Sequence, residues 1–98
     1  MVRMGRRMHP GQVLREEYMD PMQLTPLGLA QALCVAIGQI APVIEKHGPM
    51  TSDLALRLAR YFRTSPQFWL GLQTAYDLSM TQAEFGAEIE ARVQPLAA

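Results

Sequence analysis

Residue types that carry catalysis or bind metals are few and scattered along this chain of 98 residues. His9, Cys34 and His47 stand far apart, and a single cysteine can form neither an internal disulfide nor a zinc site with thiolate partners. Cys34 has no base beside it in the sequence that would activate the thiol. Glu16 and Glu17 are adjacent carboxylates, but a solvated helix face explains them better than acid–base catalysis. We therefore expect no enzyme activity, no metal and no cofactor.

The composition indicates one small globular domain. The chain is 49% hydrophobic and 18% charged, which is enough apolar material for a core and too much for a disordered tail. Nine Lys and Arg balance nine Asp and Glu, so a strongly basic nucleic-acid coat is excluded, although a local basic patch is not. The uncharged stretch 21–44 is interrupted by prolines, glycines and glutamines, and no signal-peptide pattern is visible. We expect a soluble, cytoplasmic protein that does not enter a membrane.

Helix start signals recur at short intervals along the chain. A capping residue followed by a proline or an acidic first turn stands at Thr25–Pro26, Thr51–Asp53 and Ser65–Pro66, and His9–Pro10 places a proline at a first helical position. The run Lys46–Pro49 is typical of a helix end, and Thr81–Glu84 has the spacing of a capping box that would open a last helix toward Val93. Strand signals are absent. The pattern predicts an all-α fold of five or six short helices.

The third predicted helix contains a proline. Ile37, Ile40 and Ile44 recur at helical spacing after a turn around 34–36, but Pro42 stands inside the segment. A proline in a helix interior costs on the order of 3 kcal/mol. A helix that starts late, is kinked or is shortened would relieve this cost.

Two short helices joined by a turn of three or four residues suggest a helix-turn-helix. The resemblance becomes specific when several runs are read together, namely His9-Pro10-Gly11, Leu29-Ala30-Gln31-Ala32-Leu33, 55–62 and Ser65-Pro66-Gln67-Phe68-Trp69-Leu70. From about Met8 to Leu78 the sequence closely resembles the HigA/VapI family of antitoxins, which carry a helix-turn-helix of the Cro/CI type. The resemblance implies a compact, lambda-repressor-like helix-turn-helix domain.

The resemblance also implies a function. Such proteins are the antitoxins of bacterial type II toxin–antitoxin systems. They neutralise a small basic ribonuclease toxin of the HigB type, and as homodimers they bind promoter DNA and repress their own operon. Neither role is an enzyme activity. Carried over to this sequence, the DNA-binding positions are Thr25, Ala36, Gly38, Gln39, Lys46 and His47.

The recognition segment departs from the family pattern. Relatives usually place Arg, Ser or Asn there, followed by a Gly-Lys-Arg-like cluster, whereas this chain has no Lys or Arg between Arg15 and Lys46. Only Gln39 can form a bidentate pair with adenine. Glu45 would repel the phosphate backbone beside Lys46 and His47. Cys34 stands where the family usually has glycine, so a left-handed turn there would cost roughly 1–2 kcal/mol.

Two functional hypotheses therefore remain open. The first is the complete antitoxin and autorepressor. The second is a protein-interaction module that keeps the helix-turn-helix fold but has a degenerate recognition helix, and binds a partner rather than specific DNA.

We expect three parts along the chain. Residues 1–8 form a flexible arm with Arg3, Arg6 and Arg7, residues 9–78 form the helix-turn-helix antitoxin domain, and residues 79–98 form a C-terminal helix and tail. In that tail Phe85, Ile89 and Val93 recur every four residues, which predicts a dimerisation stripe.

Two further clusters of charged residues lie outside the recognition segment. The acidic residues Glu16, Glu17 and Asp20 would attract a basic toxin through charge complementarity. The basic residues Arg57, Arg60 and Arg63 are interpreted as the solvated flank of a helix.

Overall fold

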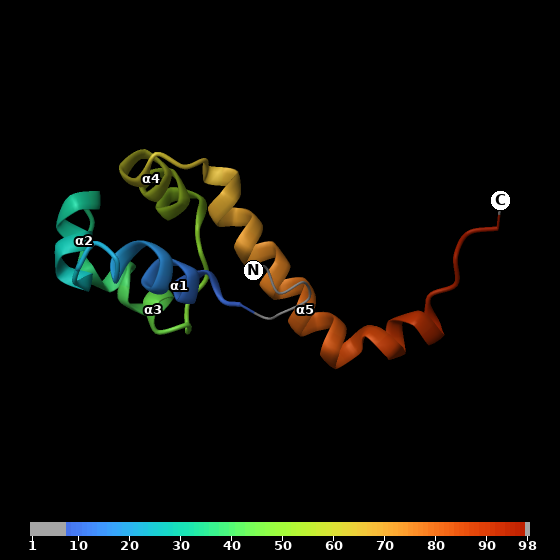
Figure 1. The fold of residues 1–98 in the computed structure, drawn as a ribbon. Coiled ribbons are helices and arrows are strands. Elements are labelled where there is room, and N and C mark those ends of the chain that lie inside the picture. The colour runs from blue at the N-terminus through green and yellow to red at the C-terminus, as the bar shows by residue number, and fades with distance from the viewer. Residues whose placement is uncertain (1–7, 98) are drawn as a thin grey trace.

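The computed structural model describes residues 8–97, and these residues form an all-helical fold (Figure 1). In chain order the elements are α1 (Pro10–Val13), the π-helix η1 (Leu14–Met19), α2 (Pro26–Leu33), the 3-10 helix η2 (Ile37–Gln39), α3 (Ala41–Ile44), α4 (Ser52–Phe62) and α5 (Pro66–Arg92). The described part of the chain contains no strand, and the all-α prediction is confirmed.

Side-chain caps start the longer helices where the sequence predicts them. In each case a hydroxyl oxygen of the capping residue accepts a hydrogen bond from a backbone N–H in the first turn, which would otherwise lack a helical partner. The pairs are Thr25 with Gly28 at 3.0 Å, Thr51 with Leu54 at 3.2 Å and Ser65 with Phe68 at 3.1 Å.

The core lies where α1, η1, α2, α3 and α4 meet the first half of α5. Trp69 is fully buried there, and its indole N–H donates to the hydroxyl of Thr64 at 2.8 Å. The ring of Tyr18 lies 4.9 Å from that of Trp69 and 5.0 Å from that of Phe62. Phe68 is exposed, and its ring lies 4.9 Å from that of Trp69 and 6.2 Å from that of Tyr18.

Gly11 allows α1 and α3 to approach closely. A Cβ atom at Gly11 would lie 1.8 Å from the carbonyl oxygen of Val43, far inside van der Waals contact, and no side-chain movement can relieve a clash with backbone. The glycine therefore sets the distance between α1 and α3, and with it the position of the segment that precedes α3.

The C-terminal helix differs from the prediction. The capping pattern at Thr81 predicts a separate helix, whereas α5 runs without interruption from Pro66 to Arg92, so this predicted start is wrong. A capping box opens a helix only where the preceding chain leaves the helical conformation, and no glycine or proline stands between Gly71 and Gly86 to end the helix. The second half of α5 projects beyond the rest of the fold, giving overall dimensions of 52 × 25 × 23 Å (Figure 1).

Within residues 8–97, no individual helix combines the length and the apolar character that crossing a membrane requires. The segments Pro26–Leu33 and Ile37–Ile44 meet that requirement only when taken together, by length and composition, and they are bent by 101°.

Candidate nucleic-acid interface

The turn that follows α2 has a left-handed backbone at Cys34, with φ 60° and ψ 45°. The N–H of Val35 donates to the carbonyl of Ala30 at 3.0 Å, which closes the helix in the manner of a Schellman motif. This is the conformation that would favour glycine, and it places the exposed residue Ala36 in an extended conformation directly before η2.

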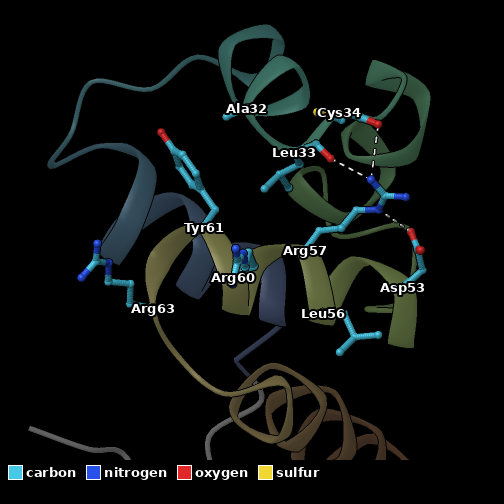
Figure 2. Close-up of a pocket in the computed structure, with 9 residues that line it drawn as sticks. All are labelled: Ala32, Leu33, Cys34, Asp53, Leu56, Arg57, Arg60, Tyr61 and Arg63. Carbon is cyan, nitrogen blue, oxygen red and sulfur yellow. Dashed lines mark hydrogen bonds and ion pairs between the residues drawn. The ribbon is translucent and has the colours of Figure 1, made fainter.

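Arg57 of α4 holds this turn in place (Figure 2). One of its terminal nitrogens donates to the carbonyl oxygen of Leu33 at 2.8 Å and to that of Cys34 at 3.3 Å. Its Nε donates to the carboxylate of Asp53 at 2.9 Å, which orients the guanidinium. A cation at the carboxyl end of α2 also complements the helix dipole.

The interpretation of Arg57 as part of a solvated flank is therefore wrong. The residue is half-buried and links α4 to the helix-turn-helix, whereas Arg60 and Arg63 are exposed as expected. The sequence did contain a signal, because Asp53 and Arg57 have the i, i+4 spacing of a helical ion pair.

The segment predicted as the third helix is divided into two elements. Ile37 to Gln39 form a single 3-10 turn, and α3 begins only at Ala41, which places Pro42 in its first turn where a missing N–H costs nothing. The late start relieves the strain that an uninterrupted helix would carry. Ile40 and Ile44 are buried, whereas Ile37, which shares their helical spacing in the sequence, is 44% exposed and does not belong to the core.

The six predicted DNA-binding residues are all exposed, and they fall into three groups. Thr25 caps the start of α2; Ala36, Gly38 and Gln39 lie on the turn before α3; Lys46 and His47 lie on the loop after it. Gln39 borders a hollow that is also lined by Gly48, Pro49 and Thr51, so the turn before α3 and the loop after α3 share one surface.

This surface carries little positive charge. Glu45 directly precedes Lys46 in the loop, and its carboxylate is 3.9 Å from Nδ1 of the exposed His47. Arg3, Arg6 and Arg7, the predicted basic arm, lie outside the described residues. What the surface offers a nucleic acid is one amide group, on Gln39, and a large apolar side chain, on Ile37. Its helical spacing in the sequence groups Ile37 with Ile40 and Ile44 and gives no sign that its side chain is exposed.

His9 is a structural residue rather than a ligand. Its Nδ1 accepts a hydrogen bond from the N–H of Gly11 at 2.9 Å, and its buried ring packs edge-on against Tyr76 at 4.9 Å. Burial lowers its pKa below the usual 6.5, the charge of Lys46 acts in the same direction, and a backbone hydrogen bond with Gly48 opposes both. No group of His, Cys, Asp or Glu within residues 8–97 could hold a metal ion.

The short helix α2, the left-handed turn and the elements η2 and α3 define a helix-turn-helix protein. No protein-family model matches the chain. It is 47% identical over 76 residues to Virulence-associated protein I of Dichelobacter nodosus, covering 78% of this chain and 70% of that protein. It is 34% identical over 86 residues to antitoxin HigA-1 of Vibrio cholerae, covering 88% and 80% respectively.

A solved structure, the Pseudomonas aeruginosa antitoxin HigA with the higBA promoter, is 38% identical and superposes with a TM-score of 0.89 over 94% of this chain and 100% of that one. The chain therefore belongs to the HigA/VapI family of helix-turn-helix antitoxins and transcriptional regulators, as the sequence resemblance predicted.

The buried His9 predicts that stability falls in mild acid. Because its pKa is lower in the folded chain than the 6.5 of the unfolded chain, the unfolded state binds the proton more readily. The contribution of neutral His9 to the free energy of unfolding is fully present above pH 6.5, and it is lost as the pH falls through 6.5 toward the lower pKa of the folded state. Urea denaturation at pH 7.5 and pH 5.0 should show a smaller loss for His9→Asn, which keeps a capping acceptor but does not titrate, than for the unmodified protein.

The exposed His47→Asn serves as the control and should lose as much stability as the unmodified protein. Equal losses in the unmodified protein and His9→Asn would show that His9 does not couple folding to pH.

Proposed function

We propose that this protein is the antitoxin of a type II toxin–antitoxin pair, that it neutralises a HigB-like ribonuclease toxin in the cytoplasm, and that as a homodimer it represses its own operon. It would act without enzyme activity and without a cofactor. The observation that carries the proposal is its helix-turn-helix, which shares the fold of an antitoxin solved with promoter DNA.

The alternative is an interaction module that does not bind specific DNA. It is favoured by the scarcity of cations, because no Lys or Arg lies between Arg15 and Lys46. The logarithm of DNA affinity falls with the logarithm of salt by roughly 0.9 per neutralised phosphate. One neutralised phosphate, through Lys46, corresponds to a slope of about 1 per protomer and about 2 per dimer.

Promoter binding distinguishes the two functions. Fluorescence anisotropy of the protein against its own upstream promoter duplex and a scrambled duplex, at several salt concentrations, should show tight binding that prefers the promoter. The Gln39→Ala substitution should weaken promoter binding by about tenfold or more, since a bidentate base contact contributes about 1–3 kcal/mol of discrimination.

Gln67→Ala, an exposed glutamine in α5, is the matched control and should bind as the unmodified protein does. Weak binding that is equal on the promoter and scrambled duplexes would overturn the repressor function and leave the interaction module.

The acidic surface of η1 and its C-terminal end is the proposed toxin-binding face. Glu16, Glu17 and Asp20 are all exposed there, so a basic toxin can approach their carboxylates. Charge complementarity of this kind raises association rates most strongly at low salt.

Reversing Glu16, Glu17 and Asp20 to Lys should lower the affinity for a HigB-like ribonuclease toxin by about tenfold or more at low salt, measured by biolayer interferometry. The charge-matched control reverses Glu84, Glu88 and Glu90 on the distal part of α5. Unchanged toxin binding after the first reversal would exclude this face.

The distal half of α5 is the proposed dimerisation element. From Met80 to Arg92 the helix buries no side chain within its own chain, yet Phe85 and Ile89 are large apolar residues that are 46% and 48% exposed. Leu78 lies two helical turns before Phe85 and is also exposed, which lengthens the apolar stripe on one face. A second copy of the chain would cover this stripe.

The double substitution Phe85→Glu and Ile89→Glu should convert the dimer into a monomer, because it places two charges in the centre of the stripe. Sedimentation velocity measures the change, with Glu90→Gln as the control. A dimer that persists after the double substitution would place the interface elsewhere.

A further inference from the structure

We propose that the turn η2 reads thymine-containing base pairs, with Ile37 contacting the C5-methyl group of a thymine and Gln39 binding an adenine. This inference rests on the proposed promoter binding and adds to it the chemistry of the bases that are read.

The first observation is that η2 buries none of its three residues. Ile37 is 44% exposed although the next isoleucine, Ile40, is completely buried. Packing within the chain therefore does not account for a large branched apolar side chain at position 37.

The second observation concerns Gly38, which separates Ile37 from Gln39. A Cβ atom added at Gly38 would have no atom within 4 Å, and the backbone there does not adopt the left-handed conformation that favours glycine. Neither packing nor backbone geometry within the chain requires a glycine at this position. Its effect is to leave the backbone bare between the two side chains, so that a flat ligand edge can approach closely.

The base edges in the major groove differ in the hydrogen-bonding and apolar groups that they present. Guanine presents two acceptors, which proteins usually bind with the paired donors of Arg or Lys, and neither residue occurs in α2, η2 or α3. Adenine presents an acceptor and a donor, which match the amide of Gln39, and thymine presents a methyl group, which matches Ile37. The exposed groups of η2 therefore complement an A·T pair rather than a G·C pair.

The test uses base analogues that change one group at a time. Replacing thymine by uracil in the promoter duplex removes only the C5-methyl group, and at one or more half-site positions it should weaken binding by about threefold to tenfold. Replacing adenine by 7-deazaadenine removes the N7 acceptor and should weaken binding in the unmodified protein but not in Gln39→Ala. Fluorescence anisotropy measures each affinity.

The variant Ile37→Ala should bind the thymine and uracil duplexes equally, at the lower affinity, with its folding verified by its melting temperature. Met22→Ala, which truncates another exposed apolar residue outside η2, is the control and should keep the full thymine preference. Promoter preference that is insensitive to uracil, or that remains methyl-dependent in Ile37→Ala, would overturn this inference while leaving promoter binding intact. Absence of any preference for the native promoter would instead overturn the proposed repressor function.

Discussion

Arg57 satisfies the carbonyl oxygens that the left-handed turn after α2 leaves without helical partners. A helix end normally exposes such groups, and here the turn passes through a backbone conformation that is unfavourable for Cys34. The guanidinium reaches the carbonyls of Leu33 and Cys34 from α4, and Asp53 fixes its orientation. Because the direction of the chain after Cys34 determines where η2 emerges, the presentation of the recognition turn depends on a side chain 23 residues further along.

Pro42 determines the conformation of the segment that follows this turn. A continuous helix through this segment would need an N–H that Pro42 lacks, and its ring would clash with the preceding turn. The chain therefore forms a single 3-10 turn before α3 begins at Ala41. The carbonyl of Pro42 then accepts hydrogen bonds from the N–H groups of His47 and Gly48 at 2.8 and 2.9 Å, which closes the following loop. The same proline thus shortens the recognition helix and shapes the loop that carries Lys46 and His47.

The sequence was sufficient for features that depend on local chemistry. The caps at Thr25, Thr51 and Ser65 form as predicted because a hydroxyl before a proline or an acidic turn has one favourable arrangement. The same reasoning failed at Thr81, where the capping pattern is present but nothing ends the preceding helix. Local signals place a helix start only when the chain is free to begin one.

Features that depend on contacts distant in the sequence were not predictable in this way. Ile37 is exposed because it lies in the separate turn η2, outside α3, and Arg57 owes its role to the turn at the end of α2, which is 23 residues away in the sequence. The six predicted DNA-binding residues are all exposed, but their spacing alone did not reveal the apolar character of the surface between them. The apolar character of this surface is evident only in the structure, where Ile40 is buried and Ile37 is exposed.

The scarcity of cations on the recognition surface bears on affinity and specificity in different ways. Phosphate contacts supply nearly all non-specific DNA binding, whereas base contacts discriminate between sequences. A scarcity of cations therefore weakens binding to every sequence. The ratio of affinities for a matched site and for random DNA then depends on the base contacts that we propose for Gln39 and Ile37. Since a repressor competes against a large excess of non-specific sites, this ratio matters more than the absolute affinity. In the proposed dimer, each of the two copies discriminates at its own half-site, so the preference for a matched site over random DNA is multiplied. A surface with few cations is therefore compatible with selective repression when the apolar stripe of α5 joins two copies.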